Sequence, residues 1–213
     1  HRDLHYPLRR QRQMCIRDRS YDQDVTKNWP LLLFLHGVGE RGNDLEKVKM
    51  HGPPKLVESD PDFPFVLVSP QCAEGKVWEA DALLGLLDDV THRLRIDSDR
   101  ICVTGLSMGG FGTWSLIAKD PGRFAAAVPI CGGGSTRDFI LPVSSQALAT
   151  LPIWVFHGEK DTVVLPEESK RLVSFFQSRL KGNIRLTLYP EAAHDSWTKT
   201  YNNPELYQWL LKQ

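Results

Sequence analysis

A serine with a glycine two residues away on each side constrains this chain more than any other feature. The run Gly105-Leu106-Ser107-Met108-Gly109 directly follows an apolar β-type run, 101–104, and directly precedes a helical pattern over 108–119. Glycines at these positions allow a sharp strand-to-helix turn, because side chains there would collide as the chain folds back. The turn would raise the Ser107 hydroxyl above the sheet at a helix N-terminus, where backbone N–H groups favour a developing negative charge.

The chain around this turn alternates short apolar runs with amphipathic stretches. This pattern is typical of a twisted, mainly parallel α/β sheet with helices on both faces. The predicted strands are 31–35, 65–69, 101–104, 125–130, 153–156 and 184–189, and the predicted helices are 80–95, 108–119, 167–180 and 204–212. Because no internal repeat or low-complexity linker interrupts the pattern, we expect residues 20–213 to form one domain.

Residues 1–19 differ in composition from the rest of the chain. Six arginines against two aspartates give them a net charge of +4, which leaves 20 − 24 = −4 for the remainder. They show neither the periodicity of a helix or strand nor the apolar segment of a signal peptide. The stretch RRQRQMCIRDRS also resembles translated adapter sequence at the ends of metagenomic gene fragments. We therefore expect a non-native or disordered tail that contributes nothing to chemistry and says nothing about secretion. The alternative is a basic arm that binds nucleic acid.

Charge and hydropathy exclude several classes of function. The 26 basic and 26 acidic side chains give a formal net charge of zero, which argues against a chain-wide basic surface for nucleic acid or an anionic membrane. The apolar runs fall far short of the ~18 residues that a membrane-spanning helix needs. We predict a soluble protein with neither a nucleic-acid nor a membrane partner, and the sequence leaves its localisation and oligomeric state open.

The cysteines show no metal-ligand spacing. They are Cys15, Cys72, Cys102 and Cys131, and no CxxC or Cys/His pattern joins them. A chain long enough to bury a large core does not need disulfide bonds to stabilise it, so we predict four free thiols. We expect no metal site and no cofactor.

A serine hydroxyl is a weak nucleophile at neutral pH and needs a base that an acid orients. Asp161 follows the predicted strand 153–156, and His194 follows the predicted strand 184–189. Both would emerge at the carboxyl edge of the sheet together with Ser107. Alone, Asp161 could be the N-cap of the helix at 167 and His194 a surface histidine. Their joint order and placement instead predict a nucleophile, acid and base: Ser107, Asp161 and His194.

The loop after the first predicted strand supplies a further element of such a site. His36-Gly37-Val38-Gly39 directly follows the strand 31–35. A tetrahedral oxyanion needs two backbone N–H donors, one from the residue after the nucleophile and one from this loop. We predict that the amides of Met108 and Val38 form this oxyanion hole.

On these residues, 29–213 resembles the α/β-hydrolase superfamily, in the esterase branch that includes feruloyl and acetyl xylan esterases, polyhydroxybutyrate depolymerase-like proteins and predicted peptidases. The matching stretches are PLLLFLHGVGERGND, GLSMGGFGTW, PIWVFHGEKDTVV and YPEAAHDSW. The resemblance implies an α/β-hydrolase fold with a Ser-Asp-His triad that maps onto Ser107, Asp161 and His194. It also implies one or two strands before the strand at 31–35, where the unrelated tail lies instead.

The resemblance implies a serine carboxylic-ester hydrolase that forms an acyl-enzyme, with feruloyl, acetyl or other short acyl esters of plant polysaccharide as substrates. An oligopeptidase or thioesterase would use the same machinery, and a non-catalytic binding module on this scaffold is the alternative from another class. The segment 132–151 is too short for a separate cap domain, so we expect an open cleft.

Aromatic residues are candidates for the wall of this cleft. Trp78 and Trp197 are predicted either to line the substrate or to lie in the core, Trp114 is expected in the core, and Phe139 is a further wall candidate.

Two other motifs lack the partners that their chemistry requires. The G-x-G-x-x-G over 37–42 has no acidic residue after the next strand to hold a ribose, and Pro53-Pro54 interrupts the helix that a dinucleotide site needs. His157-Gly158-Glu159 has the H-x-E pattern of zinc deaminases but no P-C-x-x-C after it.

Overall fold

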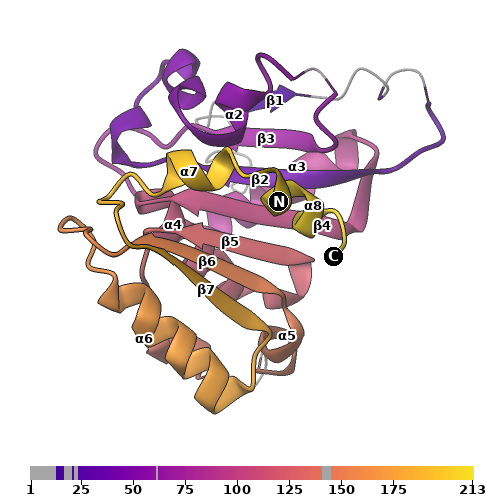
Figure 1. Cartoon of the computed structure of the whole chain (residues 1–213). Coiled ribbons are helices and arrows are strands. Elements are labelled where there is room, and N and C mark those ends of the chain that lie inside the picture. Colours follow the sequence, from indigo (N-terminus) through magenta and orange to yellow (C-terminus); the bar gives the residue numbers. More distant parts are fainter. Residues whose placement is uncertain (1–12, 17–20, 22–23, 61, 141–144) are drawn as a thin grey trace.

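A single seven-stranded sheet organises the part of the chain that the structure describes (Figure 1). The structure is a computed structural model, and it describes residues 13–16, 21, 24–60, 62–140 and 145–213. The strands are β1 (Gln13–Ile16), β2 (Trp29–Leu35), β3 (Val66–Pro70), β4 (Ile96–Leu106), β5 (Ala126–Ile130), β6 (Ile153–Gly158) and β7 (Ile184–Tyr189). They lie in the order β1-β3-β2-β4-β5-β6-β7, and β2 to β7 are parallel. The predicted mainly parallel sheet is confirmed.

Helices cover both faces of this sheet (Figure 1), as predicted. The helices are α2 (Gly52–Leu56), α3 (Ala80–Arg93), α4 (Met108–Lys119), α5 (Ser145–Thr150), α6 (Glu167–Phe175), α7 (Trp197–Tyr201) and α8 (Pro204–Leu210), with a π-helical turn over Phe176–Leu180. Side chains of β2 alternate between the two cores: Leu31, Leu33 and Leu35 pack with α3, α4 and α6, whereas Leu32 and Phe34 pack with α7 and α8. No helix in the described ranges is long and apolar enough to span a membrane.

The N-terminal edge of the sheet differs from the prediction. Residues 13–16 form β1, which pairs antiparallel with β3 from Gln13 opposite Pro70 to Ile16 opposite Leu67. The sequence predicted no strand there, because four residues are too few to show an alternating pattern and an edge strand is held by its backbone hydrogen bonds. Residues 1–12 and 17–20 lie outside the described residues, so for them the expected tail stays a prediction.

Short helices are the other elements that the sequence did not predict. In α2, Pro53 and Pro54 occupy the first turn, where a missing N–H and a fixed φ are tolerated, so these prolines begin a short helix instead of only interrupting one. The short helices α5 and α7 span too few residues to show an apolar period.

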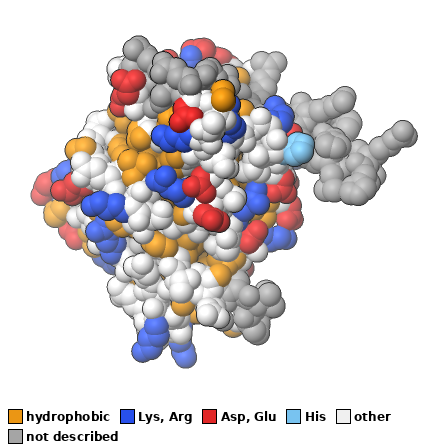
Figure 2. Space-filling view, turned by 90° about the vertical axis from the view of Figure 1, so that its right-hand side faces the viewer, with side chains coloured by type: hydrophobic (Ala, Val, Ile, Leu, Met, Phe, Trp, Pro, Cys, Tyr) orange, Lys and Arg blue, Asp and Glu red, His pale blue; other side chains and the backbone are white. Residues whose placement is uncertain are grey.

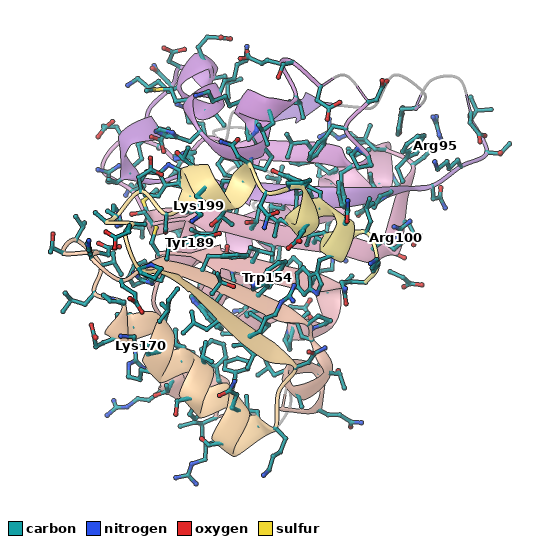
Figure 3. The ribbon with its side chains drawn as sticks, viewed as in Figure 1. Arg95, Arg100, Trp154, Lys170, Tyr189 and Lys199 are labelled. Atoms are coloured by element: carbon teal, nitrogen blue, oxygen red, sulfur yellow. The ribbon has the colours of Figure 1, made fainter. Side chains whose placement is uncertain are left out.

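The aromatic packing of α7 and α8 fixes the segment that follows β7. Trp154 of β6 packs edge-to-face against Trp209 of α8, with ring centroids 5.4 Å apart. Lys199 of α7 lies over Tyr189, the last residue of β7, with its Nζ 4.7 Å from the ring centroid (Figure 3). The connection between β7 and α7, which carries His194, is therefore held at both ends.

The turn between β4 and α4 brings two backbones into contact. A Cβ atom on Gly109 would lie 1.9 Å from the carbonyl oxygen of Leu35 at the end of β2, and one on Gly105 would lie 2.3 Å from the carbonyl oxygen of Gly109. Both distances are far below van der Waals contact with backbone atoms, which cannot rotate away. Only glycine fits at either place.

Cysteine thiols are buried within this fold. Cys72, Cys102 and Cys131 are free, as predicted, and burial raises the pKa of the Cys102 thiol to about 12. The side chain of Cys15 lies outside the described residues.

Replacing Gly109 by alanine should therefore destabilise the fold strongly. We expect Gly109→Ala to lower the free energy of unfolding by at least about 3 kcal/mol, since the backbone of β2 must move to admit the methyl group. Gly39→Ala is the matched control, because a Cβ on Gly39 meets no atom within 4 Å, and we expect it to change stability by less than about 0.5 kcal/mol. Urea denaturation followed by circular dichroism measures both, and equal midpoints for the two variants would contradict the packing.

Candidate active site

Ser107 lies in a strained turn at the junction of β4 and α4. Its backbone has φ 52° and ψ −115°, a region that residues other than glycine rarely adopt. Two hydrogen bonds hold it there: the Ser107 amide donates to the Ile130 carbonyl at 3.0 Å, and the Ser107 carbonyl accepts from the Phe111 amide at 3.1 Å. The turn therefore presents the hydroxyl at the carboxyl edge of the sheet.

The structure brings the three predicted triad residues into one hydrogen-bonded chain. His194 Nε2 lies 2.9 Å from Ser107 Oγ, and His194 Nδ1 lies 2.7 Å from Asp161 Oδ2. Asp161 comes from the loop after β6 and His194 from the loop after β7, so loops at the carboxyl ends of three parallel strands meet here. Because a carboxylate accepts from Nδ1–H, Nε2 of the neutral ring is left to accept the serine proton.

Asp161 is a buried carboxylate with several donors. Its Oδ1 accepts hydrogen bonds from the amides of Val163 at 2.8 Å and Val164 at 3.0 Å. Burial raises the pKa of Asp161, but the hydrogen bonds from His194 and from these two amides outweigh it and hold the pKa below its usual value. Asp161 does not cap α6, which begins at Glu167 behind Pro166. The carboxylate is therefore ionised at neutral pH.

The loop after β2 and the start of α4 hold the predicted oxyanion donors. Val38 begins a short 3₁₀ turn, Val38–Glu40, and Met108 is the first residue of α4. The neighbouring Gly37 amide is used, because it donates to Glu40 Oε2 at 2.9 Å. Among the described residues, the Val38 and Met108 amides are not donors in the turn, loop and capping hydrogen bonds. Both amides thus remain candidates for the oxyanion hole.

Buried polar contacts fix this loop from beneath. The Cys72 amide donates to His36 Nε2 at 2.9 Å, so Nε2 carries no proton and the neutral ring donates from Nδ1 to the Gly37 carbonyl at 2.6 Å. The Trp78 indole N–H donates to the His36 carbonyl at 3.0 Å. The contacts with Cys72 and Trp78 join the loop to the segment 71–78, so the two segments form one wall beside the site.

A pocket of about 520 Å³ opens beside Ser107 and Met108. Four aromatic side chains line it: Trp78, Phe111, Trp114 and Phe139. Trp78, Trp114 and Phe139 are largely buried, so they belong to the core and to the pocket wall at the same time. Phe111 is 41% exposed, and the sequence did not single it out. Its place four residues after Ser107 on α4 is the signal that could have identified it.

Trp197 lies beside His194, the predicted base, instead of in this pocket. Its ring packs edge-to-face against the His194 imidazole at 5.2 Å and against His51 at 5.7 Å, and it is not among the pocket-lining residues. His51 also lies near Glu40, whose Oε1 is 3.8 Å from His51 Nε2. Trp197 thus contacts the imidazole that is hydrogen-bonded to Ser107.

Cys131 lies close enough to the triad for a metal site to be considered. One ligand atom each from Cys131, Asp161 and His194 lie within 4.8 Å of one another. Burial raises the pKa of the Cys131 thiol to about 12, whereas metal binding needs the thiolate. Both ring nitrogens of His194 already form hydrogen bonds within the triad. Asp161 and His194 therefore fit a hydrogen-bonded triad with Ser107 better than a metal site with Cys131.

Comparison with known proteins finds a hydrolase family and an esterase among the proteins similar to this chain. The dienelactone hydrolase family matches residues 73–205 of the chain. A bifunctional acetylxylan esterase/xylanase, XynS20E of Neocallimastix patriciarum, is 28% identical over 148 residues, which are 66% of this chain and 20% of that protein. The chain therefore spans one fifth of this relative.

Solved structures of esterases have the same fold. A thermostable esterase matches with a TM-score of 0.77 and 32% identity over 95% of this chain, although that match covers 58% of the esterase. A ferulic acid esterase matches with a TM-score of 0.65 over 94% of this chain and 96% of its own, and at 16% identity this likeness concerns the fold alone.

The buried state of His36 predicts a pH dependence of stability. Burial lowers the pKa of His36 to about 4 from 6.5, against the opposing hydrogen bond to the Gly37 carbonyl. As pH falls from about 6.5 to about 4, the unfolded chain binds a proton that the native protein excludes, and stability decreases by up to about 3 kcal/mol. We expect NMR to show no protonation of His36 between pH 8 and 5. A His36 midpoint above pH 6 would contradict this.

His36→Gln should flatten the dependence of the urea midpoint on pH in the same window. His92→Gln is the control, since His92 is exposed on α3 and should leave the slope unchanged. The lowered pKa of Asp161 affects the stability of the fold only at lower pH. The ionised carboxylate stabilises the native protein above a pH of about 3.8, and this stabilisation is lost as the pH falls through the lower pKa that Asp161 has in the native protein.

Proposed function

The chain belongs to the dienelactone hydrolase family, and from that premise we propose that it is a serine carboxylic-ester hydrolase with Ser107, Asp161 and His194 as its catalytic triad. The observation that carries the proposal is the continuous hydrogen-bonded chain from Ser107 Oγ through His194 to Asp161 Oδ2. A nucleophile, a base and an orienting acid in this geometry are what acyl transfer requires.

The proposed reaction forms and then hydrolyses an acyl-enzyme. Ser107 Oγ attacks the ester carbonyl carbon while His194 Nε2 takes its proton, and the amides of Val38 and Met108 hold the resulting oxyanion. The imidazolium then protonates the leaving alcohol as the carbon–oxygen bond breaks. Water attacks the acyl-enzyme with His194 again as base, which releases the acid and restores Ser107. Asp161 keeps the proton on Nδ1 and stabilises the imidazolium in both steps.

We propose feruloyl, acetyl or other short acyl esters of plant polysaccharide as substrates. The aromatic lining of the pocket beside Ser107 supports an acyl group that is flat or small, and such rings stack well on a phenolic acid. The similar proteins include the acetylxylan esterase/xylanase and the ferulic acid esterase. A peptide anilide and a thioester, assayed beside methyl ferulate, acetylated xylan and p-nitrophenyl esters, would distinguish the oligopeptidase and thioesterase alternatives.

Ser107 should be the nucleophile that a fluorophosphonate probe modifies. We expect Ser107→Ala to abolish labelling and to reduce kcat for p-nitrophenyl acetate by on the order of 10⁴-fold or more, while the far-UV spectrum stays native.

Ser115→Ala is the matched control, because Ser115 lines the same pocket and should leave labelling intact. Mass spectrometry that placed the probe on Ser115 or Ser196 would contradict the assignment. If the protein binds esters but is not labelled by the probe, it is instead the non-catalytic binding module.

Phe111 should determine how well an aromatic acyl group binds. Because its ring is the most exposed aromatic of the pocket wall, we expect Phe111→Ala to raise KM for methyl ferulate about 10-fold. KM for p-nitrophenyl acetate should change less than about 2-fold, since an acetyl group does not reach the ring. Ile140→Ala is the control: Ile140 is 64% exposed and does not line the pocket. Equal effects on both esters would mean that the acyl group lies elsewhere.

A further inference from the structure

A second histidine contacts the triad acid. His157 is the fifth residue of β6, completely buried, and the sequence singled it out only for an H-x-E pattern that no metal site explains. Its Nε2 lies 2.9 Å from the Val164 carbonyl oxygen and 3.2 Å from Asp161 Oδ2, and its Nδ1 lies 2.7 Å from Ser169 Oγ. The ring therefore connects α6, through Ser169, to the acid of the triad.

The partners of the His157 ring decide where its proton lies. The Val164 carbonyl oxygen is an acceptor only, so Nε2 must carry the proton that this contact requires. In the neutral ring Nδ1 then accepts from the Ser169 hydroxyl, and Ser169 is itself fully buried. The Nε2–H consequently donates to the Val164 carbonyl, and Asp161 Oδ2 lies 3.2 Å from the same nitrogen. The hydroxyl of Ser169 prevents the ring from flipping out of this arrangement.

Asp161 Oδ2 therefore lies close to two imidazole nitrogens. His194 Nδ1 lies 2.7 Å and His157 Nε2 lies 3.2 Å from this oxygen, while the Val163 and Val164 amides donate to Oδ1. The Asp161 side chain has no exposed surface, so bulk water cannot replace a lost donor. Without His157, the orientation of Oδ2 would depend on its bond to His194 alone.

We propose that His157 is a positioning residue that fixes the Asp161 carboxylate toward His194. It acts through Asp161 and touches neither the ester nor Ser107, and the inference rests on the proposed triad. The charged groups that face it are Asp161 itself and, from α6, Glu167, which is exposed to solvent.

Two amide variants of similar size separate this role from a purely structural one. In His157→Gln the amide nitrogen replaces Nε2 and still reaches Asp161, whereas in His157→Asn it replaces Nδ1 and reaches only Ser169. We expect kcat for p-nitrophenyl acetate to fall about 10- to 100-fold in the Asn variant with KM nearly unchanged, and to stay within about 3-fold of wild type in the Gln variant.

The pH profile gives the readout that a packing defect would not change. A carboxylate that loses one donor keeps more negative charge on Oδ2 and stabilises the imidazolium more, so the acid limb of kcat/KM should move up by about half a pH unit in the Asn variant. The low-field NMR resonance of the His194 Nδ1–H should shift in the Asn variant and remain near its wild-type position in the Gln variant. This measurement needs only the fraction of protein that is folded.

An Asn variant with wild-type kcat, pH profile and His194 resonance would overturn the proposal, as would equal losses in both variants with an unshifted profile. Failure of the proposed function looks different, because the wild-type protein would then neither hydrolyse esters nor label at Ser107. Ser169→Ala is a milder variant for comparison. It removes the hydroxyl that bonds to Nδ1 of His157 but leaves the His157 Nε2–H in place, and we expect kcat to fall by less than about 5-fold.

Discussion

The contact between the Ser107 turn and the end of β2 is the constraint on which the site depends. β2 and β4 pair in parallel with Leu35 opposite Gly105, and Gly109 lies against the Leu35 carbonyl where no side chain fits. This contact sets the N-terminus of α4 beside the loop that starts at His36, so the two amides proposed to hold the oxyanion come from neighbouring segments. The strained φ of Ser107 is the conformational cost of the same turn, and the hydrogen bond to Ile130 of β5 offsets it.

Two buried carboxylates flank the site, and the backbone supports both. Glu40 accepts from the Gly37 amide on one side, and Asp161 accepts from the Val163 and Val164 amides on the other. In both cases the donors are backbone amides within three residues of the acid. Neither carboxylate therefore needs a cationic side chain as a partner, which would compete with an imidazole for the carboxylate oxygens. The face of the molecule in Figure 2 has positive and negative side chains interspersed, so no single-sign field arises there.

Sequence predicts the parts of this site that topology determines. The strand ends that carry Ser107, Asp161 and His194 follow from apolar runs, and parallel pairing brings them to one edge. The sequence could not predict a contact that depends on side-chain direction, such as Trp197 against His194. It also missed β1, whose four residues are held by pairing with β3 and not by an apolar pattern of their own.

The described part of the connection between β5 and β6 forms one wall of the pocket. Its described residues return the chain to the sheet, and Phe139 turns inward to pack edge-to-face on Trp114 and Phe176, with ring centroids 5.8 and 5.0 Å apart. A ring held from two sides by the core cannot also close over Ser107. Arg171 of α6 donates to the Gly134 carbonyl at 2.7 Å and fixes the start of the connection. The pocket is therefore shaped by residues that also hold α4 and α6 on the sheet, so the shape of the pocket and the stability of that core are coupled.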